Sequence, residues 1–215
     1  GPTTEVECPA GKAGSGGNAT CQNCLKGFYQ NAPGNTTCRE CPSGYYNEAE
    51  GSTTCNAVPP GSYYWNKKVR ACDPGYYCSG LDANQTACQA GRYTGDSGSI
   101  SCIDCSPGTY AALNASTKCI ECNDDEYQPK AKAWSCSEIK AGYYQSGPTT
   151  EVICPAGKAG SGGNATCQDC LEGFFQNAPG NTTCIECPSG FYNEAEGSTT
   201  CNAVPPGSYY WNKKV

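Results

Sequence analysis

The stretch Cys41-Pro42-Ser43-Gly44-Tyr45-Tyr46, followed by a second cysteine at Cys55, is the unit from which the chain is built. An opening cysteine comes first, then a glycine turn with two aromatic residues, then a polar return to the closing cysteine. The glycine relieves the restriction on φ in the turn, and aromatic residues favour a short strand. The pattern therefore predicts a small β-hairpin. The same phrase recurs with openings at Cys24, Cys88 and Cys105.

The composition leaves little material for a hydrophobic core. Among 215 residues, Leu, Ile, Val and Phe together number only 20, as many as cysteine alone. A chain so poor in apolar residues is either disordered or held together by covalent links. An even number of regularly spaced cysteines favours disulfides, which persist in oxidising compartments. We therefore expect a secreted, extracellular or cell-surface protein.

Other sequence features agree with this location. The formal charge of −6 is spread out, with no basic stripe for nucleic acid and no apolar run of about 18 residues for membrane insertion. Without an initiator Met or a signal peptide, we expect an internal window of a longer secreted chain. N-linked glycans are expected at six Asn-X-Ser/Thr sequons in polar returns, where the Asn side chains should be exposed. The sequons are at Asn18, Asn35, Asn84, Asn114, Asn164 and Asn181.

A long repeat divides the chain. Residues 1–69 reappear as residues 147–215 with 63 of 69 positions identical. We therefore predict one full long repeat over residues 1–146 and the start of the next over residues 147–215. Two of the six differences exchange Tyr for Phe, at 29/175 and 45/191, which keeps the ring and removes the hydroxyl.

A short repeat of about 17 residues lies inside the long one, giving nine modules per period. We predict a small, disulfide-rich, all-β fold of tandem hairpins stacked into an elongated, solenoid-like rod. Two openings are aliphatic, and these residues would pack where a half-cystine is missing. The openings are Cys8, Cys24, Cys41, Val58, Cys72, Cys88, Cys105, Cys122 and Ile139.

The cysteine spacing favours sequential disulfides, each within one module. A loop of about 15 residues closed in this way contributes on the order of 3 kcal/mol. The competing scheme is interleaved, for example Cys21–Cys38 with Cys24–Cys41. The sequential scheme pairs Cys8–Cys21, Cys24–Cys38, Cys41–Cys55, Cys72–Cys78, Cys88–Cys102, Cys105–Cys119, Cys122–Cys136, Cys154–Cys167, Cys170–Cys184 and Cys187–Cys201.

Catalytic and metal chemistry is disfavoured. The Cys-X-X-Cys pairs resemble zinc or thioredoxin-type motifs, but they do not group into fours and no βαβ pattern surrounds them. The chain has no His, the usual triad base and commonest metal ligand. Asp124-Asp125-Glu126 matches no calcium-loop spacing. We expect no enzyme activity, no metal and no cofactor apart from the glycans.

The pattern Cys-Pro-x-Gly-x-Tyr…Cys-x-x-Cys, as at Cys41–Tyr46 and Cys38–Cys41, resembles ephrin-receptor-like cysteine-rich repeats of the GCC2/GCC3 type. It is also similar to the first submodule of tumour-necrosis-factor-receptor repeats. This resemblance implies elongated extracellular stalks, receptor ectodomains, protist surface proteins or flagellar mastigonemes. The aliphatic openings at Val58 and Ile139, and the extra Cys78, depart from the family pattern.

The leading hypothesis is a structural protein, the shaft of a glycosylated, mastigoneme-like extracellular filament or surface appendage. Its partners would be further copies of itself and other extracellular glycoproteins. The near identity of the long repeats supports it, because identical units provide identical contacts at regular intervals. The alternative is a receptor or adhesin stalk that binds a protein or glycan. Its binding surface would be exposed aromatic residues, although packing between modules is favoured for them, at Tyr63, Tyr64, Trp65 and Trp134.

Overall fold

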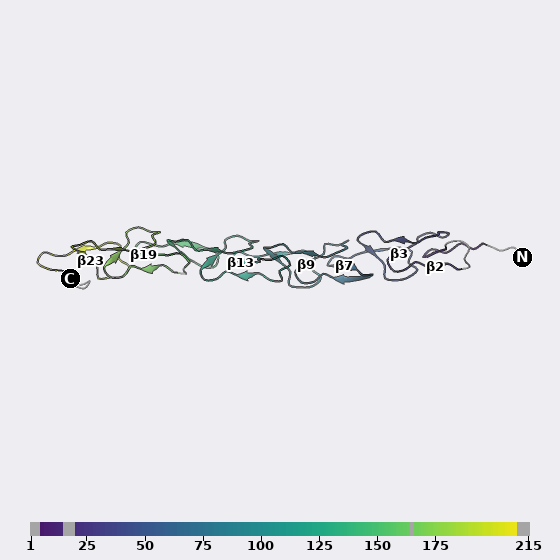
Figure 1. Cartoon of the computed structure of the whole chain (residues 1–215), viewed down its shortest axis with the longest axis horizontal. Coiled ribbons are helices and arrows are strands. Elements are labelled where there is room, and N and C mark those ends of the chain that lie inside the picture. The colour runs from purple at the N-terminus through teal and green to yellow at the C-terminus, as the bar shows by residue number, and fades with distance from the viewer. Residues whose placement is uncertain (1–4, 15–19, 164–165, 210–215) are drawn as a thin grey trace. The chain divides into compact units, whose positions relative to one another are not determined.

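The computed structural model describes residues 5–14, 20–163 and 166–209, and these residues form short antiparallel hairpins (Figure 1) and one isolated parallel bridge, between Tyr63 and Asp82. The described residues contain no helix. The paired strands are β1 (Lys12–Ala13) with β2 (Gln22–Asn23), β3 (Phe28–Tyr29) with β4 (Arg39–Glu40), β5 (Tyr45–Tyr46) with β6 (Asn56–Ala57), β7 (Ser62–Trp65) with β8 (Lys68–Ala71), β9 (Tyr76–Tyr77) with β10 (Thr86–Ala87), β11 (Arg92–Tyr93) with β12 (Ile103–Asp104), β13 (Thr109–Tyr110) with β14 (Ile120–Glu121), β15 (Glu126–Tyr127) with β16 (Ser137–Glu138), β17 (Tyr143–Gln145) with β18 (Glu151–Ile153), β19 (Lys158–Ala159) with β20 (Gln168–Asp169), β21 (Phe174–Phe175) with β22 (Ile185–Glu186), and β23 (Phe191–Tyr192) with β24 (Asn202–Ala203). The prediction of a disulfide-rich, all-β fold of hairpin modules about 17 residues long is confirmed.

The first strand of each module follows the turn, and in the modules closed by a disulfide of 13 or 14 residues' separation the second strand follows the closing cysteine. In the module that opens at Cys24, Phe28 pairs with Glu40 and Tyr29 with Arg39. The second strand is therefore made of the two residues inside the Cys-X-X-Cys motif. These residues are exposed, because each module contributes only a two-stranded sheet.

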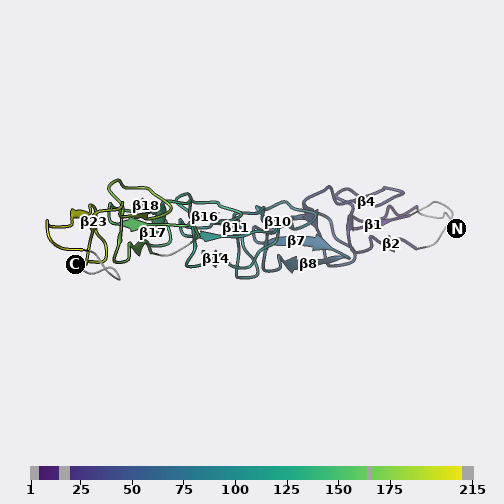
Figure 2. The ribbon, with the colours of Figure 1, turned by 60° about the vertical axis from the view of Figure 1, so that its left-hand side comes forward.

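Two hairpins are longer than the rest, and both belong to modules without a disulfide. Strands β7 and β8 have four residues each, and β17 and β18 have three each (Figure 2). The β7–β8 turn places Asn66 at φ 48° and Lys67 at φ 62°, as a two-residue type I′ turn requires. Val58 and Ile139 are only 2 % and 3 % exposed. The prediction that they pack in place of a half-cystine is confirmed.

Cysteines and small polar residues fill the interior. The opening cysteines of six modules are fully buried. Next to them lies the residue three positions after the turn glycine. This residue is both polar and buried in five modules, and in the module that opens at Cys72 it is Cys78, which bonds to the opening cysteine. The buried polar residues are Gln30, Asn47, Thr94, Gln176 and Asn193.

Neighbouring modules are joined by backbone hydrogen bonds. Between the modules that open at Cys72 and Cys88, Gly75 N donates to Thr94 O (2.9 Å) and Cys78 N to Ser99 O (3.0 Å). In the opposite direction, Gly98 N donates to Cys72 O (2.8 Å). Because these donors and acceptors belong to the backbone, the junction tolerates different side chains.

Six turn glycines also contact the module two places further along. A Cβ added at Gly75 would overlap the carbonyl oxygen of Ala115, and one at Gly61 would overlap that of Gly98. A module therefore contacts both its neighbour and its next neighbour. Gly11, Gly44, Gly142 and Gly157 repeat this contact.

The contacts divide the chain into two compact units. One comprises residues 1–103 and 114–118, and the other comprises residues 104–113 and 119–215. Each unit contains one of the two near-identical 69-residue copies. The described hairpins of the copies correspond, so that β3–β4 in one matches β21–β22 in the other, 146 residues later.

Candidate functional site: sequons and module junctions

The structure contains the sequential disulfides and none of the interleaved ones. No cysteine is free, so none is left to bind zinc or to act as a redox thiol. The bonds are Cys8–Cys21, Cys24–Cys38, Cys41–Cys55, Cys72–Cys78, Cys88–Cys102, Cys105–Cys119, Cys122–Cys136, Cys154–Cys167, Cys170–Cys184 and Cys187–Cys201.

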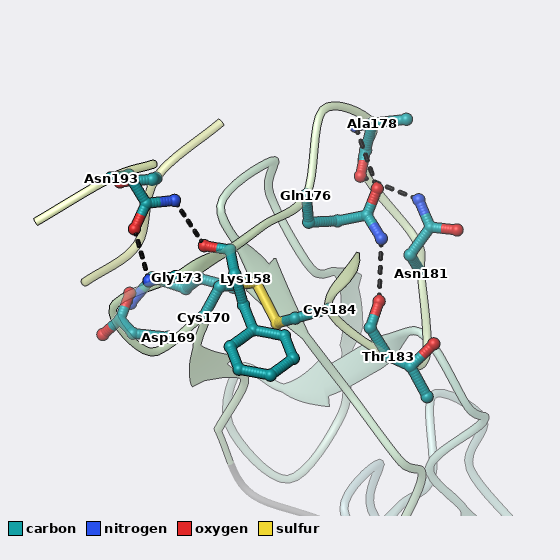
Figure 3. The surroundings of a disulfide bond; sticks show 12 residues. Lys158, Asp169, Cys170, Gly173, Gln176, Ala178, Asn181, Thr183, Cys184 and Asn193 are labelled. Atoms are coloured by element: carbon teal, nitrogen blue, oxygen red, sulfur yellow. Dashed lines mark hydrogen bonds and ion pairs between the residues drawn. A yellow bond between two sulfur atoms is a disulfide. The ribbon is translucent and has the colours of Figure 1, made fainter. Parts of the chain in front are cut away.

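Buried amide side chains complete the polar contacts around the disulfides (Figure 3). Asn193 Oδ1 accepts a hydrogen bond from Gly173 N (2.8 Å), while Asn193 Nδ2 donates to Phe174 O (2.8 Å). Asn193 therefore ties its own module to the preceding one. Gln176 acts within its module, with Nε2 donating to Thr183 O (2.8 Å).

Replacing Asn193 with alanine should destabilise this junction by about 1–3 kcal/mol, because the buried N–H of Gly173 loses its acceptor. Native-state hydrogen exchange should show faster exchange at Gly173. The control is Asn202→Ala in the same module, since Asn202 is exposed and lies on strand β24. Equal effects of the two substitutions would contradict this role for Asn193.

A side-chain network supports the module that opens at Ile139, which has no disulfide. Glu151 Oε1 accepts hydrogen bonds from Lys140 Nζ (2.6 Å) and from the Tyr127 hydroxyl (2.8 Å), which belongs to the preceding module. The hydrogen bond from Lys140 lowers the pKa of Glu151, and the bond to Glu151 raises the pKa of Lys140. The same carboxylate raises the pKa of Tyr127 by accepting its hydrogen bond. The network replaces part of what a disulfide supplies elsewhere.

This network should weaken in acid. Because the folded-state pKa of Glu151 is lowered, its contribution is present above the ordinary carboxyl pKa of about 4.3 and is lost as the pH falls through the lowered value. An NMR titration of the Glu151 carboxyl carbon should show a midpoint pH below this ordinary carboxyl pKa. Lys140→Gln should move this midpoint back towards the ordinary value. A wild-type midpoint at or above the ordinary value would refute the network.

The sequons lie in the returns between strands, but their Asn side chains are not all exposed as expected. Asn84 and Asn114 are exposed. Asn35 and Asn181 are half-buried, and their Nδ2 atoms donate to Ala32 O (3.1 Å) and Ala178 O (3.0 Å). Asn-linked glycosylation replaces one of the two hydrogens on Nδ2, so the other remains for these bonds. The sequons at Asn18 and Asn164 lie outside the described residues.

The four aromatic residues considered for a binding surface differ in their exposure. Tyr63 and Tyr64 are half-buried, and the Tyr64 ring lies 5.6 Å from that of Tyr46. Trp65 and Trp134 are 57 % and 67 % exposed. The expectation that all four pack between modules is therefore wrong for the two tryptophans, which lie at a hairpin turn and in a return.

The described residues contain several hollows that are open to solvent. One of about 180 Å³ is lined by Lys26, Phe28, Tyr45 and Lys67 among others, and two of about 640 Å³ and 540 Å³ lie beside Phe191 and Asn202. No group of three potential ligands from His, Cys, Asp and Glu that could hold a metal occurs in the described part of the chain, Asp124-Asp125-Glu126 included. The same residues include no helix that could cross a membrane.

These features define a disulfide-stapled tandem-repeat protein. Residues 11–57, 157–203 and 179–210 match the family described as "Tyrosine-protein kinase ephrin type A/B receptor-like". The match supports the resemblance to ephrin-receptor-like cysteine-rich repeats, a non-catalytic extracellular type of domain. Among curated proteins, none matches the chain significantly. The ten disulfides and the family match indicate an extracellular or cell-surface protein with a structural or receptor-like role.

Proposed function

We propose that this chain forms part of the shaft of a glycosylated extracellular filament or surface appendage, mastigoneme-like, whose partners are further copies of itself. The observation that carries the proposal is the repetition of the same junction. Backbone hydrogen bonds join successive modules, turn glycines contact the module two places further along, and the long period preserves 63 of 69 residues in its second copy. Such a chain presents the same surface at regular intervals, as a polymer requires.

The alternative is a receptor or adhesin stalk. Exposed Trp65 and Trp134 favour it, because tryptophan is enriched in binding hot spots. Against it, Trp65 lies in a stretch that the second copy repeats without change, as Trp211. The binding surface of a receptor would be expected to vary between repeats, whereas these two copies barely vary.

Analytical ultracentrifugation of native, non-reduced protein tests the shaft proposal. We expect concentration-dependent assemblies larger than a monomer, with N-linked glycans on the native chain. Sedimentation only as monomers at every concentration would overturn the polymer. Saturable binding of a protein or glycan by such monomers would instead establish the receptor or adhesin stalk.

A further inference from the structure

The hairpin β7–β8 has an inner and an outer face. Its register places Tyr64 opposite Val69 on the inner face. This face contacts the preceding module, where the Tyr64 hydroxyl donates to Asn47 O (3.4 Å). The Val69 N–H donates to Glu48 Oε1 (2.9 Å) in the same module. The inner face is thus already occupied.

The outer face is basic and contacts no other module through its charged groups. Trp65 lies opposite Lys68, two positions along the strands from Arg70, and the turn adds Lys67. All four side chains are exposed. Within the described residues none of the three cations takes part in an ion pair, and the module from Val58 to Cys72 contains no acidic residue. We call Trp65, Lys67, Lys68 and Arg70 the basic face.

A second hairpin, β15–β16, has the opposite charge. Glu126 lies directly opposite Glu138, an arrangement of like charges that destabilises a two-stranded sheet. Asp124 and Asp125 precede it in the turn, and both are exposed. We call Asp124, Asp125, Glu126 and Glu138 the acidic face.

The acidic face lacks a neutralising cation within the described part of its own chain. None of its four carboxylates forms an ion pair there, and Glu126 Oε2 accepts only a neutral hydrogen bond, from Asn123 Nδ2 (3.0 Å). Lys132 from the same module pairs with Asp104 (3.2 Å) instead. A cation supplied from outside would relieve the repulsion between Glu126 and Glu138.

We propose that the basic face of one chain docks on the acidic face of a second copy. The proposal rests on the proposed function, since it identifies the lateral contact of the polymer. Each long repeat contains one face of each sign, so every chain can both donate and accept the contact. A contact between two different faces does not close on itself and can extend into an assembly.

The strength of this contact comes from several charges acting together. A single exposed ion pair is weak and screened by salt, but each contact brings three cations against four carboxylates. Linked contacts bind far more tightly than one. Because the contact is made by exposed charges, assembly should weaken as the salt concentration rises.

Charge reversal tests the contact in chain 1–215. The acidic-face variant carries Asp124→Lys, Asp125→Lys and Glu138→Lys. The matched control reverses three other exposed carboxylates, Glu50→Lys, Glu194→Lys and Glu196→Lys, and changes the net charge equally. The basic-face variant reverses Lys67, Lys68, Arg70 and the repeated Lys213 and Lys214 to Glu.

Sedimentation at low and at 0.5 M salt is the measurement. We expect each face variant to associate at least tenfold more weakly than wild type, the control to associate like wild type, and an equimolar mixture of the two face variants to regain association. Association that persists in both face variants would overturn this contact but leave the filament standing. If wild type binds dextran sulfate through the basic face and never self-associates, both this contact and the filament fail.

Discussion

Alanine at Gly142 is expected to destabilise the fold by opening the contact between the module that begins at Ile139 and the module two places further on. Alanine at Gly147 should reduce the folding stability much less. Both glycines have φ of +83°, so both substitutions carry the same left-handed strain of about 1–3 kcal/mol. Only at Gly142 would the new Cβ overlap a backbone atom, the carbonyl oxygen of Gly180. Such overpacking adds roughly 1–3 kcal/mol.

Hydrogen exchange separates the two effects. In Gly142→Ala, exchange should accelerate at the inter-module amides Gly142 N and Gly180 N, which in wild type donate to Gly160 O and Cys154 O. In Gly147→Ala it should accelerate only near the substituted turn, where nothing lies within 4 Å of the added atom. If both variants lose the same protection at Gly180, the contact between next-neighbour modules does not contribute to stability.

Full reduction and alkylation should unfold the whole chain, including the hairpins that contain no disulfide. Each of the nine loops of about 15 residues contributes on the order of 3 kcal/mol when closed, and together they exceed the 5–15 kcal/mol net stability of an ordinary domain. Few apolar side chains remain to replace them. The Tyr64 ring of this hairpin packs against Tyr46 of the preceding module, so this hairpin should melt with the rest.

Amide protection at Val69 distinguishes cooperative from independent hairpins. Its N–H donates to Glu48 of the preceding module, and this protection should vanish after reduction. A chain alkylated without prior reduction is the control and should keep it. Persistence of β7–β8 protection in the reduced chain would mean that this module folds alone, which isolated two-stranded hairpins seldom do.

The sequence patterns predicted those features of the fold that form within a single module. The glycine-aromatic turn, the short strand and the nearest cysteine pairing follow from spacing along fewer than twenty residues. The burial of Val58 and Ile139 was also predictable, since an aliphatic residue in the place of a half-cystine needs an apolar environment. These features depend on local chemistry.

The features that escaped prediction depend on contacts between modules. Nothing in the sequence of a single hairpin shows that Asn193 would be buried, because its partners Gly173 and Phe174 belong to the preceding module. Similarly, Cys78 was interpreted from the sequence as an extra cysteine. In the structure it occupies the buried position three residues after the turn glycine, which Thr94 occupies in the next module. A comparison of the residues three positions after each turn glycine would have found this position.

The exposure of Trp65 was misjudged for a related reason. Tyr64 and Trp65 are neighbours in sequence, but alternation along β7 directs them to opposite faces. Only the register with β8 shows that the face with Tyr64 is the one covered by the preceding module. The opposite face of the hairpin is therefore exposed, and it carries Trp65 and the cations of the basic face, to which we assign the lateral contact.

Electron microscopy of native, non-reduced material tests the filament most directly. If each hairpin module advances roughly 10–15 Å, as strands of a few residues allow, nine modules predict an axial period of roughly 90–140 Å. Filaments with that period are the expected result. Isolated flexible particles without lateral association, or particles ending at a membrane, would contradict the filament and indicate a receptor or adhesin stalk.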